Sequence, residues 1–134
     1  MTQVLRLSHL CLGASNLERT IEFYTATLGA KVVHEFKKPD GFLYGIFLAL
    51  GNGTFVEFFL QQEPPPKGGY FRHFCLQVDD IHAWANHLAA KGLKCEISRS
   101  RSDKTLQCWI TDPDGIQIEF HQYDSESALT PHLI

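Results

Sequence analysis

The chain has 134 residues, a formal net charge of −3 and 44% hydrophobic residues. This length fits a single domain spanning residues 1–134. The charge balance lacks the basic excess that nucleic-acid binding needs, and the small basic cluster at residues 99–104 is interpreted as a solvated loop. No run reaches the ~20 apolar residues of a membrane span. Since no signal-peptide pattern is present, we expect a cytoplasmic protein whose four cysteines stay reduced (Cys11, Cys75, Cys95, Cys108).

The first half predicts a strand, a helix and three further strands. The first strand covers about residues 4–12. In the segment Ser15-Asn16-Leu17-Glu18, a hydroxyl stands three residues before a Glu, which is the capping-box pattern of a helix start. The helix ends at Gly29, a typical C-terminal cap. Strands are expected at about 30–36, 42–50 and 54–61, and Asn52-Gly53 predicts a tight hairpin between the last two.

The second half predicts the same order of elements. A proline-rich stretch at about 62–70 is a natural linker. A strand at about 71–78 leads to Asp79 and Asp80, which are good N-cap residues, and the helix that follows closes near Gly92. Strands are expected at about 93–98, 105–111 and 115–122, with the turn Asp112-Pro113-Asp114-Gly115 before the last one. Residues 124–134 form a polar tail.

The two halves share a motif as well as an order of elements. His9-Leu10-Cys11-Leu12 is matched by His73-Phe74-Cys75-Leu76. A later strand of each half carries one carboxylate, Glu57 or Glu119, which follows its histidine by 48 or 46 residues. The sequence therefore predicts an α+β fold of two βαβββ repeats, at about 4–61 and 71–123, whose curved mixed sheets surround a concave site.

Alternation along the strands places both carboxylates on the face away from the helices. Glu119 shares its face with His121, while Ile118 and Phe120 point to the other face. Glu57 lies between Phe55 and Phe59. A carboxylate among aromatic rings is costly unless something compensates its charge, and a divalent cation would do so.

The repeated positions give a metal-site hypothesis with the ligands His9, Glu57, His73 and Glu119. Imidazole nitrogens and carboxylate oxygens suit one divalent ion of Ni, Co, Zn, Mn or Fe. The alternative is that each histidine is an ordinary polar residue and each carboxylate reaches a sheet edge. His121 could contact a ligand residue or a substrate. Cys11 and Cys75 are expected to be small buried residues, with thiolate ligation as an alternative.

At these residues the chain resembles the vicinal-oxygen-chelate superfamily of glyoxalase I, fosfomycin and bleomycin resistance proteins and extradiol dioxygenases. The resemblance covers nearly the whole chain, and its most specific pieces are the helix motif that ends in Phe23-Tyr24 and the Asp112–Gly115 turn before Glu119. With two carboxylates, the ligand set looks like that of glyoxalase I. The resemblance implies a lyase or isomerase that chelates adjacent oxygens of a small substrate and shifts a proton through an enediolate-like state. Glu119 would be the base, with Glu57 as the second candidate.

The resemblance also has departures and alternatives. Glyoxalase I enzymes typically carry an Arg and an Asn for glutathione where this chain has Gly13 and Gln61, so we expect weak glutathione-dependent turnover or none. Aromatic residues suggest a substrate pocket, although each could be core instead (Phe55, Phe59 and Trp109, with Phe42 and Phe47). The resemblance implies a homodimer, with the site within one chain or between two. The alternative functions are a non-catalytic small-molecule binding protein of the bleomycin-resistance type and, less favoured, an iron dioxygenase.

Overall fold

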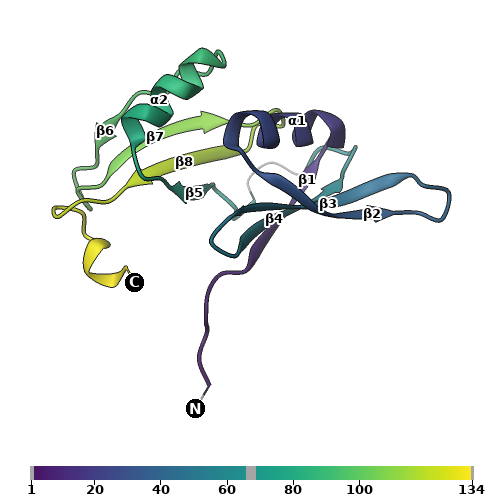
Figure 1. Cartoon of the computed structure of the whole chain (residues 1–134), viewed down its shortest axis with the longest axis horizontal. Helices are drawn as coiled ribbons and strands as arrows, with labels where there is room; N and C mark the ends of the chain where they lie inside the picture. Colours follow the sequence, from purple (N-terminus) through teal and green to yellow (C-terminus); the bar gives the residue numbers. More distant parts are fainter. Residues whose placement is uncertain (1, 66–68, 134) are drawn as a thin grey trace. The chain divides into compact units, whose positions relative to one another are not determined.

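The computed structural model describes residues 2–65 and 69–133. The chain forms two compact units, Met1–Lys67 and Gly68–Ile134. Their boundary falls within the segment 62–70, for which the sequence predicts a linker; residues 66–68 of that segment lie outside the described residues. Each unit has its own α-helix and its own four-stranded sheet (Figure 1).

The first unit contains β1 (His9–Ala14), α1 (Leu17–Leu28), β2 (Lys31–Lys37), β3 (Leu43–Gly51) and β4 (Thr54–Leu60). The strand order in the sheet is β1-β4-β3-β2. β1 runs parallel to β4, and the other two pairings are antiparallel. The predicted hairpin turn is confirmed, since Asn52 and Gly53 have φ angles of 50° and 74°.

The second unit repeats this arrangement with β5 (Phe74–Gln77), α2 (Ile81–Ala90), β6 (Ser98–Arg99), β7 (Leu106–Thr111) and β8 (Gln117–Gln122). The order is β5-β8-β7-β6, with β5 parallel to β8. A short 3-10 helix, η1 (Thr130–His132), follows. The predicted α+β class with two βαβββ repeats is confirmed. Within the part of the chain that the structure describes, no helix is long and apolar enough to cross a membrane.

Each helix packs on one face of its own sheet and leaves the other face uncovered by that helix. In the first unit the buried Tyr24 ring of α1 lies 5.0 Å from Phe58 of β4. In the second unit Trp84 of α2 lies 5.6 Å from Phe120 of β8. Because side chains alternate along a strand, Glu57 and Glu119 are directed to the opposite face from Phe58 and Phe120.

Both helices begin at a side-chain cap. In α1 the cap is Asn16, whose Oδ1 accepts the Arg19 N–H at 3.0 Å, and the predicted role of Ser15 as the cap is wrong. A one-residue shift suffices because an amide oxygen caps as well as a hydroxyl does. Asp80 caps α2, as expected, by accepting the N–H groups of His82 and Ala83. Gly29 closes α1 with a left-handed φ of 72°.

Three predicted strands begin three or more residues before the observed ones. β1 begins at His9 and not near residue 4, because its parallel register, His9 opposite Phe55, would place residues before His9 beside the hairpin turn at 52–53. Val4 is accordingly 92% exposed. β5 begins at Phe74, so His73 precedes its strand and does not lie within it. β6 has two residues, Ser98 and Arg99, and only Ser98 falls within the predicted 93–98.

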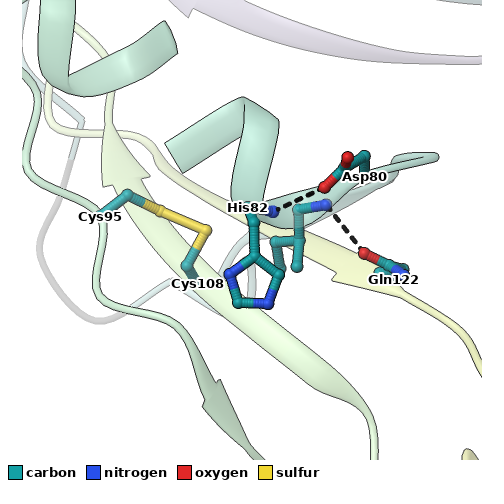
Figure 2. The surroundings of a disulfide bond; sticks show 6 residues. Asp80, His82, Cys95, Cys108 and Gln122 are labelled. Atoms are coloured by element: carbon teal, nitrogen blue, oxygen red, sulfur yellow. Dashed lines mark hydrogen bonds between the residues drawn. A yellow bond between two sulfur atoms is a disulfide. The ribbon is translucent and has the colours of Figure 1, made fainter. Parts of the chain in front are cut away.

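The expectation of four reduced cysteines is wrong, because Cys95 and Cys108 form a disulfide with Cα atoms 5.6 Å apart (Figure 2). The antiparallel register of β6 and β7, with Ser98 opposite Gln107, would place Cys95 opposite Ile110. The bond instead ties Cys95 to Cys108, in keeping with the position of residues 93–97 outside the ladder. Cys108 is fully buried and pairs in register with Phe120, so the disulfide belongs to the helix-covered face.

Candidate metal and substrate site

In the first unit, strand register sets the surroundings of Glu57. This residue on β4 lies between Cys11 of β1 and Phe47 of β3. Its side chain is 14% exposed, and its Oε1 lies 3.8 Å from Nε2 of His9, the first residue of β1. A nearly buried carboxylate and an imidazole therefore face each other on the side of the sheet away from α1.

The second unit builds the same pair from equivalent strands. Glu119 on β8 lies between Cys75 of β5 and Trp109 of β7. Its side chain is 8% exposed, and its Oε1 lies 3.4 Å from Nε2 of His73. The repeat seen in the sequence is thus a repeat of geometry, with the same residue types at the same register positions.

An aromatic ring contacts the edge of each imidazole. His9 meets Phe47 at a centroid distance of 5.2 Å and an interplanar angle of 83°. His73 meets Trp109 at 4.6 Å and 76°. Edge-to-face packing of this kind fixes the direction of a ring without using its nitrogens. Both imidazoles are therefore positioned while their Nε2 atoms remain directed at the carboxylates.

The two halves differ at the position two residues after the carboxylate. His121 of β8 pairs with Gln77 of β5, as Phe59 of β4 pairs with Gly13 of β1. His121 is 8% exposed, and its Nε2 lies 3.0 Å from Oε2 of Glu119. That nitrogen has no hydrogen-bond partner, because the close approach to the carboxylate lacks hydrogen-bond geometry. The sequence suggested His121 as a contact residue, and the structure brings it against Glu119.

Tyr123 is a neighbour of His121 that no sequence motif predicted. Its hydroxyl lies 3.0 Å from Nδ1 of His121, and its ring packs against the imidazole. Burial, and then the nearby acidic groups, raise the pKa of Tyr123, so the phenol keeps its proton. The only sequence signal was its position, two residues after His121 on an alternating strand.

Two thiols lie beside the carboxylates. Cys11 and Cys75 are free and exposed, so the expectation that both are buried is wrong. Partial burial of the sulfur, and then the charge of Glu119, raise the pKa of Cys75 to about 12. Burial, and then Glu57, also raise the pKa of Cys11. Both cysteines are thus neutral thiols at pH 7 unless a cation binds them.

The aromatic residues proposed as substrate contacts lie in different surroundings. Phe55 packs edge-on against Phe47 at 6.4 Å. Phe59 belongs to a larger group, with Phe36 at 5.1 Å and Tyr44 stacked at 6.2 Å. Trp109 is 36% exposed beside His73. Phe42, in contrast, precedes β3 and is 49% exposed, with the Lys38 ammonium over its ring.

The structure therefore brings the predicted site residues together in two groups, one in each unit. His9, Glu57, Phe55 and Phe59 come from the first, and His73, Glu119, His121 and Trp109 come from the second. In the second unit, Cys75, Glu119 and His121 each offer one donor atom, and the three atoms lie within 4.8 Å of one another. These are the residue types that hold divalent transition-metal ions.

Comparisons with known proteins agree with this fold. The model of the Glyoxalase/Bleomycin resistance protein/Dioxygenase superfamily matches residues 6–120. A lactoylglutathione lyase of Neisseria meningitidis is 28% identical over 128 residues, 90% of this chain and 93% of the relative. A trivalent organoarsenical cleaving enzyme of Bacillus sp. is 33% identical over 126 residues, 87% and 72% of the two chains.

Solved structures give the same result. A glyoxalase family protein from Enterococcus faecalis superposes with a TM-score of 0.74 at 26% identity, covering 87% of this chain and 97% of the other. A fosfomycin resistance protein from Listeria monocytogenes shares the fold, with a TM-score of 0.71 at 17% identity over 95% and 100% of the two chains. With its two βαβββ units and its matched His–Glu pairs, this chain belongs to the glyoxalase/bleomycin resistance protein/dioxygenase superfamily.

Proposed function

We propose that the protein is a metal-dependent enzyme of the glyoxalase kind, a lyase or isomerase acting on a small molecule with adjacent oxygen atoms. The observation that carries the proposal is the repeated pair: an imidazole Nε2 within 3.8 Å of a nearly buried carboxylate in one unit and within 3.4 Å in the other. A coincidental contact between a histidine and a carboxylate would not be expected to recur at equivalent positions of both units. The names of the lactoylglutathione lyase relatives support the same reaction class.

The residues fit a divalent cation. The Glu57 and Glu119 side chains are 14% and 8% exposed, and a carboxylate that is nearly removed from water needs compensating positive charge. A separation of 3.4 Å between two donor atoms subtends about 108° at an ion with metal–ligand bonds of about 2.1 Å, which is a normal coordination angle. The proposed ligands are His9, Glu57, His73 and Glu119, for an ion such as Ni, Co, Zn, Mn or Fe.

The reaction follows from where charge develops. A bound divalent ion supplies positive charge beside two neighbouring substrate oxygens, which makes an adjacent C–H bond more acidic. Glu119 then accepts the proton and returns it to the neighbouring carbon, with Glu57 as the second candidate for this role. Burial keeps water from competing for the proton. His73 lies on the side of Glu119 Oε1, and its ring packs against Trp109.

Glutathione is not expected to be the preferred co-substrate. Gly13 and Gln61 lie next to each other, since a side chain at residue 13 would meet the Gln61 side chain, and the Gln61 N–H donates to the Ala14 carbonyl at 2.8 Å. Neither residue supplies a cation for a glutathione carboxylate. Assays with methylglyoxal and glutathione should therefore give weak turnover or none, whereas other compounds with vicinal oxygens remain candidates.

The proposed active form is a homodimer or a monomer in which the His9–Glu57 pair of one first unit and the His73–Glu119 pair of one second unit bind the same ion. Each unit supplies two of the four ligands, so the complete set needs one unit of each kind. The two units can come from the same chain or from two copies.

The deciding experiment measures metal binding by variants of the two carboxylates. Protein purified without a histidine tag should contain about one divalent ion per pair of units. Glu57→Gln should lower metal affinity at least ~10-fold. Removing a residue that only hydrogen-bonds to a metal ligand already lowers metal affinity about 10-fold or more, and removing a ligand itself should lower it further. Glu63→Gln, in an exposed segment, is the matched control. Unchanged affinity in the Glu57 variant would reject the four-ligand set.

A second candidate function, binding a small molecule without turnover, is supported by the aromatic group on the same face as Glu57. Phe36 and Tyr44 pack against Phe59, and Phe47 packs against Phe36, which would suit a flat aromatic ligand. Ion-free protein that gains no thermal stability from Ni, Co, Zn or Mn, yet is stabilised by an aromatic ligand, would favour this candidate. Oxygen uptake with a catechol would instead indicate the dioxygenase alternative.

A further inference from the structure

The second unit holds a set of three donors from two adjacent strands. Cys75 of β5 lies opposite Glu119 of β8, and His121 follows two residues later on the same face. One atom from each, the sulfur, a carboxylate oxygen and an imidazole nitrogen, lies within 4.8 Å of the other two. Thiolate, carboxylate and imidazole are the donors that zinc and cobalt accept in proteins.

The unpartnered nitrogen of His121 points to a ligand. The His121 side chain is 10% exposed, and its Nε2 lies 3.0 Å from Glu119 Oε2 without a hydrogen bond between them. Leaving a buried polar atom unsatisfied is unfavourable. A separation of 3.0 Å subtends about 90° at an ion with bonds of about 2.1 Å, so one cation can bind both atoms.

Tyr123 contacts the other ring nitrogen of His121. Its hydroxyl lies 3.0 Å from Nδ1 of His121. In the tautomer with the proton on Nδ1, that proton is donated to Tyr123 and Nε2 presents its lone pair toward Glu119. Histidine ligands commonly donate the other ring N–H in this way, which fixes the ring and raises its basicity.

The first unit lacks the third donor. Cys11 stands opposite Glu57 as Cys75 stands opposite Glu119. Phe59, however, occupies the register position of His121 and packs among aromatic rings. The protein thus contains an internal control, with a thiol and a carboxylate in both units and an imidazole at this position in only one of them.

We propose that the second unit binds a thiophilic divalent cation of the zinc or cobalt kind through Cys75 Sγ, Glu119 Oε2 and His121 Nε2. The thiol proton is released to solvent when the metal–sulfur bond forms. Three protein ligands leave a fourth position for water or a substrate atom. The set needs no residue of the first unit, and it shares only Glu119 with the metal centre proposed above, through the carboxylate oxygen that faces away from His73.

Cobalt(II) spectroscopy of the metal-free full-length protein tests the proposal, because cobalt–thiolate bonds give an intense near-ultraviolet charge-transfer band that nitrogen and oxygen ligands lack. The titration is anaerobic and without added thiol, so that Cys95 and Cys108 stay bonded to each other. The band should saturate at one cobalt per chain. Cys75→Ser should abolish it, and Cys11→Ser, the matched change in the first unit, should leave it unchanged.

His121→Phe reproduces the residue of the first unit and should weaken cobalt binding at least ~10-fold. His121→Gln tests the same contact with a polar replacement if the Phe variant folds poorly. An independent measurement needs no variant: zinc should slow alkylation of Cys75 but not of Cys11, as measured by peptide mass spectrometry. Equal protection of the two thiols would reject the proposal.

The outcomes also separate the two metal proposals. Cobalt that binds without a thiolate band and is lost in Glu57→Gln would support the four-ligand centre and overturn the set in the second unit. A thiolate band that is present in both the wild type and Glu57→Gln would support the set in the second unit. If, in addition, Glu57→Gln left the total amount of bound cobalt unchanged, this result would reject the four-ligand centre and leave the set in the second unit supported.

Discussion

At the scale of single residues, the two carboxylates differ in what lies beside their second oxygen. Glu119 has His73 at Oε1 and His121 at Oε2, at 3.4 and 3.0 Å. Glu57 has His9 at Oε1, and the position matching His121 is Phe59. A carboxylate between two imidazoles is more strongly oriented than one with a single neighbour. This difference is the structural reason to prefer Glu119 as the base.

A second residue-scale feature is the ion pair at the start of the C-terminal segment. Arg99 binds both oxygens of Asp124, at 3.2 and 2.8 Å. The guanidinium, and then hydrogen bonds from the Glu126 N–H and the Ser127 hydroxyl, lower the pKa of Asp124 to about 2. A carboxylate whose pKa is lower in the folded state than its ordinary value of 3.8 stabilises the fold at pH values above 3.8. This contribution is lost as the pH falls through about 2.

We therefore expect Asp124→Asn to be less stable than the wild type at pH 5 and the difference to shrink between about pH 4 and pH 2. Urea unfolding at several pH values measures it. Glu63→Gln provides the matched change from carboxylate to amide in an exposed segment. A difference that stays constant down to pH 2 would mean that the ion pair does not account for the effect of the substitution.

At the scale of elements, the caps and turns explain why each segment starts and stops where it does. The Asn52-Gly53 hairpin and the Asp112–Gly115 turn were predictable because their residue types are required by the backbone conformation. Asp112 accepts the N–H groups of Asp114 and Ile116 and so fixes the entry into β8. The start of the strand that carries Glu119 and His121 is thereby set by local sequence.

The cap of α1 is a direct test at this scale. Asn16→Ala should destabilise the protein by about 1 kcal/mol, because it removes the acceptor of the Arg19 N–H. Ser15→Ala should cost less than about 0.5 kcal/mol, since Ser15 precedes the N-cap residue and its hydroxyl accepts from the exposed Arg19 side chain. Chemical denaturation compares the two. The reverse order would restore the capping-box interpretation with Ser15 as the cap.

Contacts between elements were harder to predict than the elements themselves. Hydrophobic alternation correctly separated Phe58 and Phe120 from Glu57 and Glu119, because a buried face leaves a period of two in the sequence. The neighbours of Glu119 across the sheet depend on register, which no local pattern specifies. For this reason the contact with Cys75 and the support of His121 by Tyr123 appeared only in the structure.

At the scale of the whole molecule, duplication made the fold and the two His–Glu pairs predictable, while the disulfide was not. A repeat states which residues are equivalent, and equivalent residues in two similar units have similar neighbours. Cys95 and Cys108 have no counterparts in the first half, and their separation of 13 residues does not by itself indicate a bond. The pairing depends on how residues 93–97 leave the sheet.

The disulfide carries its own prediction. Closing a loop of this length should stabilise the protein by about 3 kcal/mol in the chain-entropy view. A Cys95→Ala, Cys108→Ala double variant should lose about that much in urea unfolding, and the wild type should lose a similar amount on reduction. Thiol titration of the unfolded, unreduced protein should find two free thiols, Cys11 and Cys75. Four free thiols would show that the bond is not formed.

All four strands of each sheet come from the same half of the chain, with no exchange of strands between the two described sheets. Either half can therefore be copied, recombined or reordered in evolution without breaking a ladder, as a circular permutation opened near residues 62–70 would do. A phenylalanine at one of two equivalent positions and a histidine at the other is the kind of divergence that this freedom permits. The two copies can therefore carry different chemistry on the same register.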